Sequence, residues 1–115
     1  MLELSRTQVE AFERNQERQF ARASLARMTA QMPDLVPDIP EQEAVGQGVR
    51  LIRRFAKSDF VRSPDWLDVI LWLGWIFGED RMQDPDIAQA LSNTAIAPTE
   101  RLKAATTLAF DQMRA

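Results

Sequence analysis

Apolar residues are most concentrated between residues 63 and 78, in the stretch SPDWLDVILWLGWIFG. No polar side chain interrupts this stretch from Val69 to Phe77. Ser63 before the run favours a helix start, and Gly78 after it favours a helix end. A helix of about fourteen residues is too short to cross a bilayer, which takes about twenty apolar residues. The pattern therefore predicts a central helix that is buried among the other elements of the protein.

This central helix has two apolar faces. At about 100° per residue, one face carries six residues that we expect to form the core: Trp66, Val69, Ile70, Leu73, Ile76 and Phe77. The other face carries three apolar residues and one charge: Leu71, Trp72, Trp75 and Asp68. Either helices of the same chain cover this second face, as is usual for aromatic stripes, or a partner does. A buried Asp68 would need a cation, for which Arg53 and Arg54 are the candidates.

A sparser apolar stripe precedes the central helix. Ser5 and Gln8 have the spacing of a capping box, and apolar residues continue at helical intervals from Val9 to Met32. These signals predict a long first helix over residues 6–32. Because its first half is only thinly apolar, we expect that half to project from the body or to lie along a partner.

Prolines and capping residues predict three further helices. They begin at Pro40, Asp84 and Pro98. Pro33 and Pro37 make the connector before the second helix extended, and Gly48 in that helix would let another helix approach closely. Five helices without a strand pattern predict an all-α fold, a single compact bundle over residues 1–115 with residues 41–115 as its core.

The residue types that are missing limit the possible chemistry. The chain has no cysteine, histidine or tyrosine, so it forms no disulfide or thiolate metal site and lacks the commonest general base. The acidic loop from Glu79 to Asp86 lacks the spacing, central glycine and final glutamate of a calcium-binding EF-hand. We therefore expect no catalytic, cofactor or metal site, and a protein that is not an enzyme.

Basic residues form two ridges on a chain whose net charge is −3. One ridge lies on the second helix and one on the first: Arg50, Arg53, Arg54 and Lys57, and Arg14, Arg18 and Arg22. Each is most simply a solvated face, although such a ridge could also bind an acidic protein or the phosphates of DNA. The negative net charge disfavours general affinity for nucleic acid.

The motifs between roughly residues 41 and 110 occur in a particular order along the chain. The segment VRLIRRFA precedes a helix with Asp65 and Asp68 near its start, and then come Gly78, an acidic loop, Asp84-Pro85, and Arg101-Leu102. This order resembles small all-helical proteins encoded beside type VI secretion effectors and their spike proteins. The resemblance implies a non-enzymatic partner of a secreted antibacterial effector, acting as an immunity protein, an adaptor or a chaperone.

We therefore expect a protein-interaction module that binds one cognate protein, without a cofactor and without a membrane. The expected partner-binding residues are the second face of the central helix and the two ridges: Leu71, Trp72, Trp75, Asp68, Arg50, Arg53, Arg54, Lys57, Arg14 and Arg18. The alternatives are a small DNA-binding regulator that uses the ridge from Arg50 to Lys57, and a structural homo-oligomer that closes the side of Trp72 and Trp75 against a second copy. The N-terminal sequence MLELSRTQ shows no signal-peptide pattern, so we expect a cytoplasmic protein.

Overall fold

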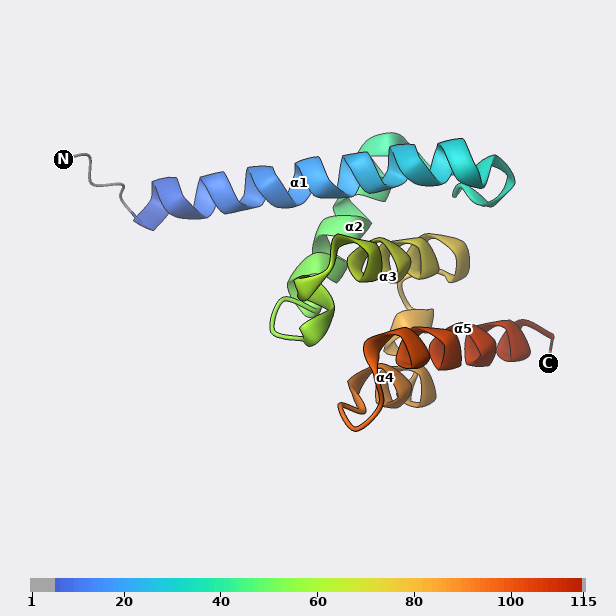
Figure 1. The fold of residues 1–115 in the computed structure, drawn as a ribbon. Coiled ribbons are helices and arrows are strands. Elements are labelled where there is room, and N and C mark those ends of the chain that lie inside the picture. Colours follow the sequence, from blue (N-terminus) through green and yellow to red (C-terminus); the bar gives the residue numbers. More distant parts are fainter. Residues whose placement is uncertain (1–5, 115) are drawn as a thin grey trace.

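The computed structural model describes residues 6–114, with side-chain surroundings from residue 14 onward. Within these residues the chain forms five α-helices and no strand (Figure 1): α1 (Arg6–Gln31), α2 (Glu41–Arg54), α3 (Pro64–Phe77), α4 (Pro85–Ser92) and α5 (Pro98–Arg114). Three short 3₁₀ turns lie between them: η1 (Pro33–Leu35), η2 (Asp59–Arg62) and η3 (Arg81–Gln83). The predicted all-α bundle of five helices is confirmed, whereas the capping box of Ser5 and Gln8 lies outside the described side chains.

α3 lies in the middle of the bundle, between two groups of helices. α1 and α2 pack on one side of it, α5 packs on the other, and α4 packs against α5. In Figure 1, α1 runs along the top, α3 runs through the centre, and α4 and α5 form the bottom. The prediction that α3 is a central helix is therefore confirmed, whereas α4 packs mainly against α5.

Local signals fix the ends of α3 and α4. Pro64 occupies the first turn of α3, and Gly78 ends the helix with φ 98° while its N–H donates to the Gly74 carbonyl at 2.9 Å. The predicted side-chain cap from Ser63 is wrong, since Ser63 stands at the cap position without a capping hydrogen bond. Asp84 does cap α4, because its carboxylate accepts the backbone N–H groups of Asp86 and Ile87.

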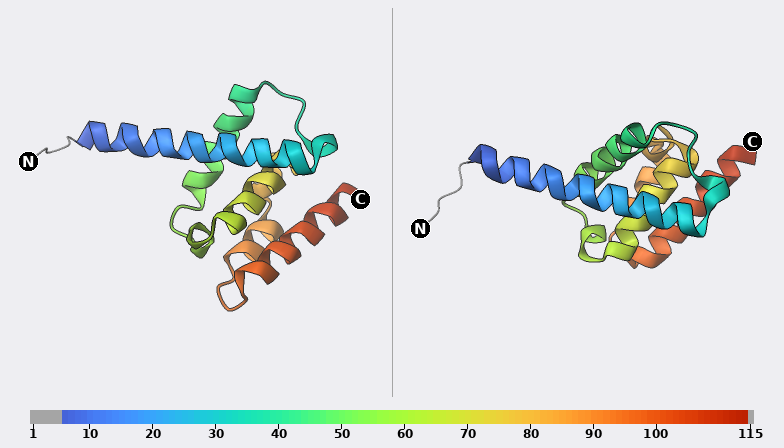
Figure 2. Two further views of the ribbon diagram at one scale, coloured as in Figure 1. Left: turned by 45° about the horizontal axis from the view of Figure 1, so that its top comes forward. Right: turned by 90° about the horizontal axis from the view of Figure 1, so that it is seen from above.

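Only the C-terminal half of α1 is packed on the bundle. Its buried residues recur at helical intervals: Ala21, Ser24, Leu25 and Met28. No side chain from residue 14 to residue 19 is buried, and Figures 1 and 2 show the first half of α1 extending beyond the other helices. The thinly apolar sequence of this half agrees with its projection into solvent.

Two glycines let α2 approach its neighbours closely. A Cβ atom on Gly48 would lie 3.0 Å from the Cβ of Ala21 in α1 and 3.0 Å from the ring of Trp75 in α3. A Cβ atom on Gly74 of α3 would collide with the side chain of Leu51 in α2. The predicted role of Gly48 is confirmed, and it explains how α1, α2 and α3 form one tightly packed unit.

Candidate functional site

The second face of α3 is covered by its own chain. Leu71 is fully buried and Trp75 is 4% exposed. The indole N–H of Trp75 donates to the Ala44 carbonyl of α2 at 2.9 Å, and that of Trp72 donates to Ser24 of α1 at 3.1 Å. α1 and α2 thus supply both the apolar cover and the acceptors that buried tryptophans need. The assignment of Leu71 and Trp75 to a partner-binding surface is corrected accordingly, because these side chains are buried, whereas Trp72 is half-buried and held against α1 by its hydrogen bond.

Asp68 is buried on the same side, 7% exposed, and its partner is Arg27 of α1. The Arg27 guanidinium donates from Nε to Oδ2 of Asp68 at 2.9 Å and from Nη2 to Oδ1 of Asp68 at 2.6 Å. This hydrogen-bonded pair raises the pKa of Arg27. The prediction that Arg53 or Arg54 pairs with Asp68 is wrong. Since Asp68 is fully engaged by α1, it serves the contact between α1 and α3 and is not available to a partner.

The basic ridge of α2 is largely used within the chain. Arg50 donates to both oxygens of Glu79 at 2.6 and 2.9 Å, which lowers the pKa of that carboxyl group. Arg53 donates a hydrogen bond to the Glu17 carboxylate of α1 at 2.7 Å. Arg54 donates one to the Met82 carbonyl of η3 at 3.1 Å. Lys57 is exposed, but it lies in the turn after α2 and not on the helical face predicted for it. These contacts connect α2 to α1 and to the acidic loop, so the ridge has less charge to offer to DNA or to an acidic partner.

The second predicted ridge lies on the free side of α1. Arg14 and Arg18 are exposed on the projecting half, and Arg22 is exposed where α1 reaches the start of α2. The closest approach of Arg22 to Glu41 is 3.9 Å, which is too long for a hydrogen bond. Of the residues predicted to bind a partner, Arg14 and Arg18 are exposed, as is Lys57.

Sequence reasoning missed Arg101, a buried cation at the start of α5 that is 2% exposed. Its guanidinium forms an ion pair with Asp59 of η2 and donates to the carbonyls of Leu91 and Ile96 at 3.0 and 2.8 Å. It also lies over the Phe60 ring, 4.8 Å from the centroid. The hydrogen bonds from Arg101 lower the pKa of Asp59. Arg101 therefore joins η2, α4 and α5, and its position four residues before Ala105 on the buried stripe was the available signal.

A large apolar hollow lies between α3 and α5, and we call it the α3–α5 groove. Its volume is about 580 Å³, and it is lined mainly by Trp66, Val69, Leu102, Thr99, Thr106 and Thr107. The hydroxyl groups of Thr106 and Thr107 donate to carbonyls of their own helix at 2.7 and 3.0 Å. The groove therefore presents methyl groups, an indole and hydroxyl oxygens that can only accept hydrogen bonds.

This groove changes the interpretation of the first face of α3. Ile70 and Leu73 are buried as predicted, but Trp66 and Val69 are only half-buried. No buried side-chain nitrogen or oxygen lacks a partner in the described part of the chain. The N–H of Trp66 donates to none of the described residues, and its indole is half-buried at the edge of the groove. The prediction that this whole face is core is corrected, because Ile76 and Phe77 are half-buried as well, and all four residues pack at the edge of the core.

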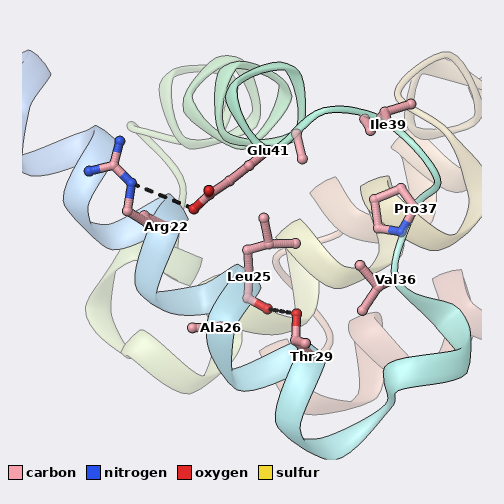
Figure 3. Close-up of a pocket in the computed structure, with 9 residues that line it drawn as sticks. Arg22, Leu25, Ala26, Thr29, Val36, Pro37, Ile39 and Glu41 are labelled. Carbon is pink, nitrogen blue, oxygen red and sulfur yellow. Dashed lines mark hydrogen bonds and ion pairs between the residues drawn. The ribbon is translucent and has the colours of Figure 1, made fainter.

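A second hollow, which we call the strap pocket, lies where residues 33–40 pass over the end of α1. It measures about 280 Å³ and has an apolar lining of Leu25, Ala26, Val36, Pro37, Ile39 and Ala44. Arg22 and Glu41 stand together at one side of it, opposite the prolines and aliphatic residues of the connector (Figure 3). The strap pocket is thus smaller than the α3–α5 groove and has charged groups at its edge.

No protein-family model matches this chain, and no curated protein or solved structure matches it either. Among residues 14–114, the side chains of aspartate and glutamate form no group of three or more placed to hold a metal ion. None of the described helices combines the length and the apolar character that crossing a membrane requires.

Proposed function

We propose that this protein is a non-enzymatic protein-interaction module that binds an amphipathic helix of a partner protein in the α3–α5 groove. The observation that supports this most directly is the position of Trp66. The other two tryptophans have acceptors for their N–H groups on α1 and α2, whereas Trp66 lines an apolar hollow and its N–H donates to none of the described residues. Tryptophan in such a position is typical of binding hot spots.

The shape of the groove suits a helix. α3 and α5 run side by side in the same direction in Figures 1 and 2, and the residues that line the hollow come from the start of α3 and from about two turns of α5, Thr99 to Thr107. Asp65 stands on the α3 edge and Lys103 on the α5 edge. A partner helix would place apolar residues at positions i, i+3, i+4 and i+7 over Trp66 and Leu102. Complementary charges on that helix would fix its direction by pairing with Asp65 and Lys103.

The partner class comes from the resemblance to proteins encoded beside type VI secretion effectors. It suggests that the bound helix belongs to a secreted bacterial effector, which this protein would meet in the cytoplasm before secretion. As an immunity protein it would protect the cell from that effector. As an adaptor or chaperone it would instead be required for loading the effector.

The test is co-expression with the protein encoded by the adjacent gene, followed by size-exclusion chromatography. The wild-type chain should elute as a complex, and Trp66→Ala should weaken the complex about a hundredfold, a loss typical of a tryptophan hot spot. Ile96→Ala is the matched control, since Ile96 is 43% exposed and lies outside the groove lining. A complex that survives Trp66→Ala unchanged, or no complex at all, would contradict the proposal. A concentration-dependent dimer of the chain alone would show that a second copy fills the groove.

A further inference from the structure

The strap pocket has two charges of opposite sign beside an apolar interior. Arg22 and Glu41 approach within 3.9 Å, and their side chains are 59% and 68% exposed. Neither makes a hydrogen bond to another described residue, so the guanidinium fork and both carboxylate oxygens are open to a ligand. Figure 3 shows these two groups at one side of the hollow and the connector residues Val36, Pro37 and Ile39 on the other.

The pair of charges selects the ligand. A simple carboxylate would gain from Arg22 but would be repelled by Glu41, and a simple ammonium ion would meet the reverse. A ligand that carries both charges on neighbouring atoms can satisfy both groups at once, with its carboxylate on Arg22 and its ammonium on Glu41. A residue inside a peptide carries neither charge, and a chain terminus carries only one of them. The charges therefore favour a free amino acid over a peptide segment.

The volume limits the size of that ligand. A hollow of about 280 Å³ holds about nine water molecules at ~30 Å³ each, and it is at the small end of the range for ligand pockets. Leu25, Val36 and Ile39 would surround an aliphatic side chain of four carbon or sulfur atoms.

We propose that the strap pocket binds a free apolar α-amino acid of the size of leucine or methionine, with Arg22 on its carboxylate and Glu41 on its ammonium group. This site is separate from the α3–α5 groove and does not depend on the function proposed for that groove. Binding would fix the connector of residues 33–40 against α1.

The test is a titration of the full-length ¹⁵N-labelled protein with each ligand, in which the amide chemical shifts report binding. L-leucine should shift the amides of residues 25–29 and 36–44 in a saturable way. N-acetyl-leucine, which lacks the cation, and leucine amide, which lacks the carboxylate, should each bind at least about tenfold more weakly, as expected for losing one charged contact.

Three variants assign the contacts. Arg22→Gln should lower the affinity for leucine about tenfold and leave the affinity for leucine amide unchanged. Glu41→Gln should also lower the affinity for leucine, but it should not lower the affinity for N-acetyl-leucine. Ala26→Leu should fill the pocket and abolish binding of all three ligands, with the fold kept because residue 26 is exposed. Arg18→Gln, one turn earlier on the same ridge and outside the pocket, is the matched control and should change nothing.

Two results would overturn the proposal. One is the absence of shifts around the strap pocket at millimolar concentrations of leucine while the amide spectrum remains that of the folded protein. The other is equal affinity for leucine, N-acetyl-leucine and leucine amide, since the pocket would then recognise only the apolar side chain.

Discussion

The two sides of α3 carry similar residues but have different surroundings. On the side of α1 and α2, Trp75 is buried and Trp72 is half-buried, and each donates its N–H to a residue of a neighbouring helix. On the side of α5, Trp66 lines a groove of about 580 Å³, and its N–H donates to none of the described residues. The difference is that α1 and α2 supply acceptors for the N–H groups of Trp72 and Trp75, whereas no described residue accepts the N–H of Trp66. It also separates residues that hold the fold together from residues available to a partner.

The largest expected effect comes from a tryptophan on the closed side. Trp75→Ala should lower the free energy of unfolding by about 3–5 kcal/mol, because it leaves a cavity and removes the donor for the Ala44 carbonyl. Trp66→Ala should cost only about 1–2 kcal/mol, because part of that ring is already in water. Urea unfolding of both variants measures the difference. Similar losses for the two variants would remove the distinction between the two sides.

Arg101 tests what holds α5 in place beside the open groove. Arg101→Leu should cost about 3 kcal/mol, because it removes the ion pair with Asp59 and leaves the carbonyls of Leu91 and Ile96 without their donor. Arg114→Leu at the other end of α5, where the side chain is 80% exposed, should have little effect. Thermal unfolding measures both. An Arg101→Leu variant as stable as wild type would mean that packing alone positions α5.

Two glycines in α2 test how tightly the closed side is packed. Gly48→Ala should destabilise the protein by about 1–3 kcal/mol, because its methyl group would press on Ala21 and Trp75 at 3.0 Å. Gly46→Ala is a matched control one half-turn away, where the new methyl would meet only the end of Arg50 at 3.7 Å. It should stabilise α2 by about 0.5–1 kcal/mol through helix propensity. If both substitutions were stabilising, the contact between α1, α2 and α3 would be looser than described.

The smallest effect is the response to acid. The pKa of three carboxyl groups is lowered, in each case first by a side-chain hydrogen bond: Asp59 from Arg101, Glu79 from Arg50, and Asp84 from Gln112. Such a group stabilises the fold above its unfolded pKa of about 4, and this contribution is lost as the pH falls through the lower folded value. The free energy of unfolding should therefore decrease as the pH drops below about 4.

Urea unfolding at several pH values measures this decrease, and Glu79→Gln should make it shallower. Asp59 and Asp84 lie beside α4 and α5, so amides of α5 should lose protection from hydrogen exchange in acid before the N–H groups of Trp72 and Trp75 do. A constant free energy of unfolding from neutral pH to pH ~3 would contradict the assignment of these ion pairs and caps.

The helix ends could be predicted from the sequence because their signals are local. Pro64, Gly78 and Asp84 act on the backbone within a few residues, and the helices begin and end close to the predicted positions. The burial of each face of α3 could not be predicted, because an all-apolar helix carries no polar stripe to orient it. The partner of Asp68 was also out of reach, since Arg27 lies 41 residues away in the chain and only the crossing of α1 over α3 brings it near.

The accessibility of the candidate surfaces also depends on contacts between parts of the chain that are far apart in sequence. The basic ridge of α2 is visible in the sequence, but its contacts with Glu17 and Glu79 depend on where α1 and the acidic loop pass. Trp66 is assigned to the core by periodicity alone, and only the position of α5 leaves it open to solvent. The sequence therefore identifies which residues are apolar or charged, while tertiary packing decides which of them remain accessible.

The most direct test of this division is hydrogen exchange of the three tryptophan indole N–H groups, followed in ¹⁵N-labelled protein at neutral pH. The N–H groups of Trp72 and Trp75 should exchange slowly, because they are hydrogen-bonded to α1 and α2. The N–H of Trp66 should exchange much faster, and it should be the indole signal that moves when a partner fills the α3–α5 groove. Slow exchange at Trp66, or exchange at Trp72 and Trp75 as fast as at Trp66, would contradict the division into a closed and an open side.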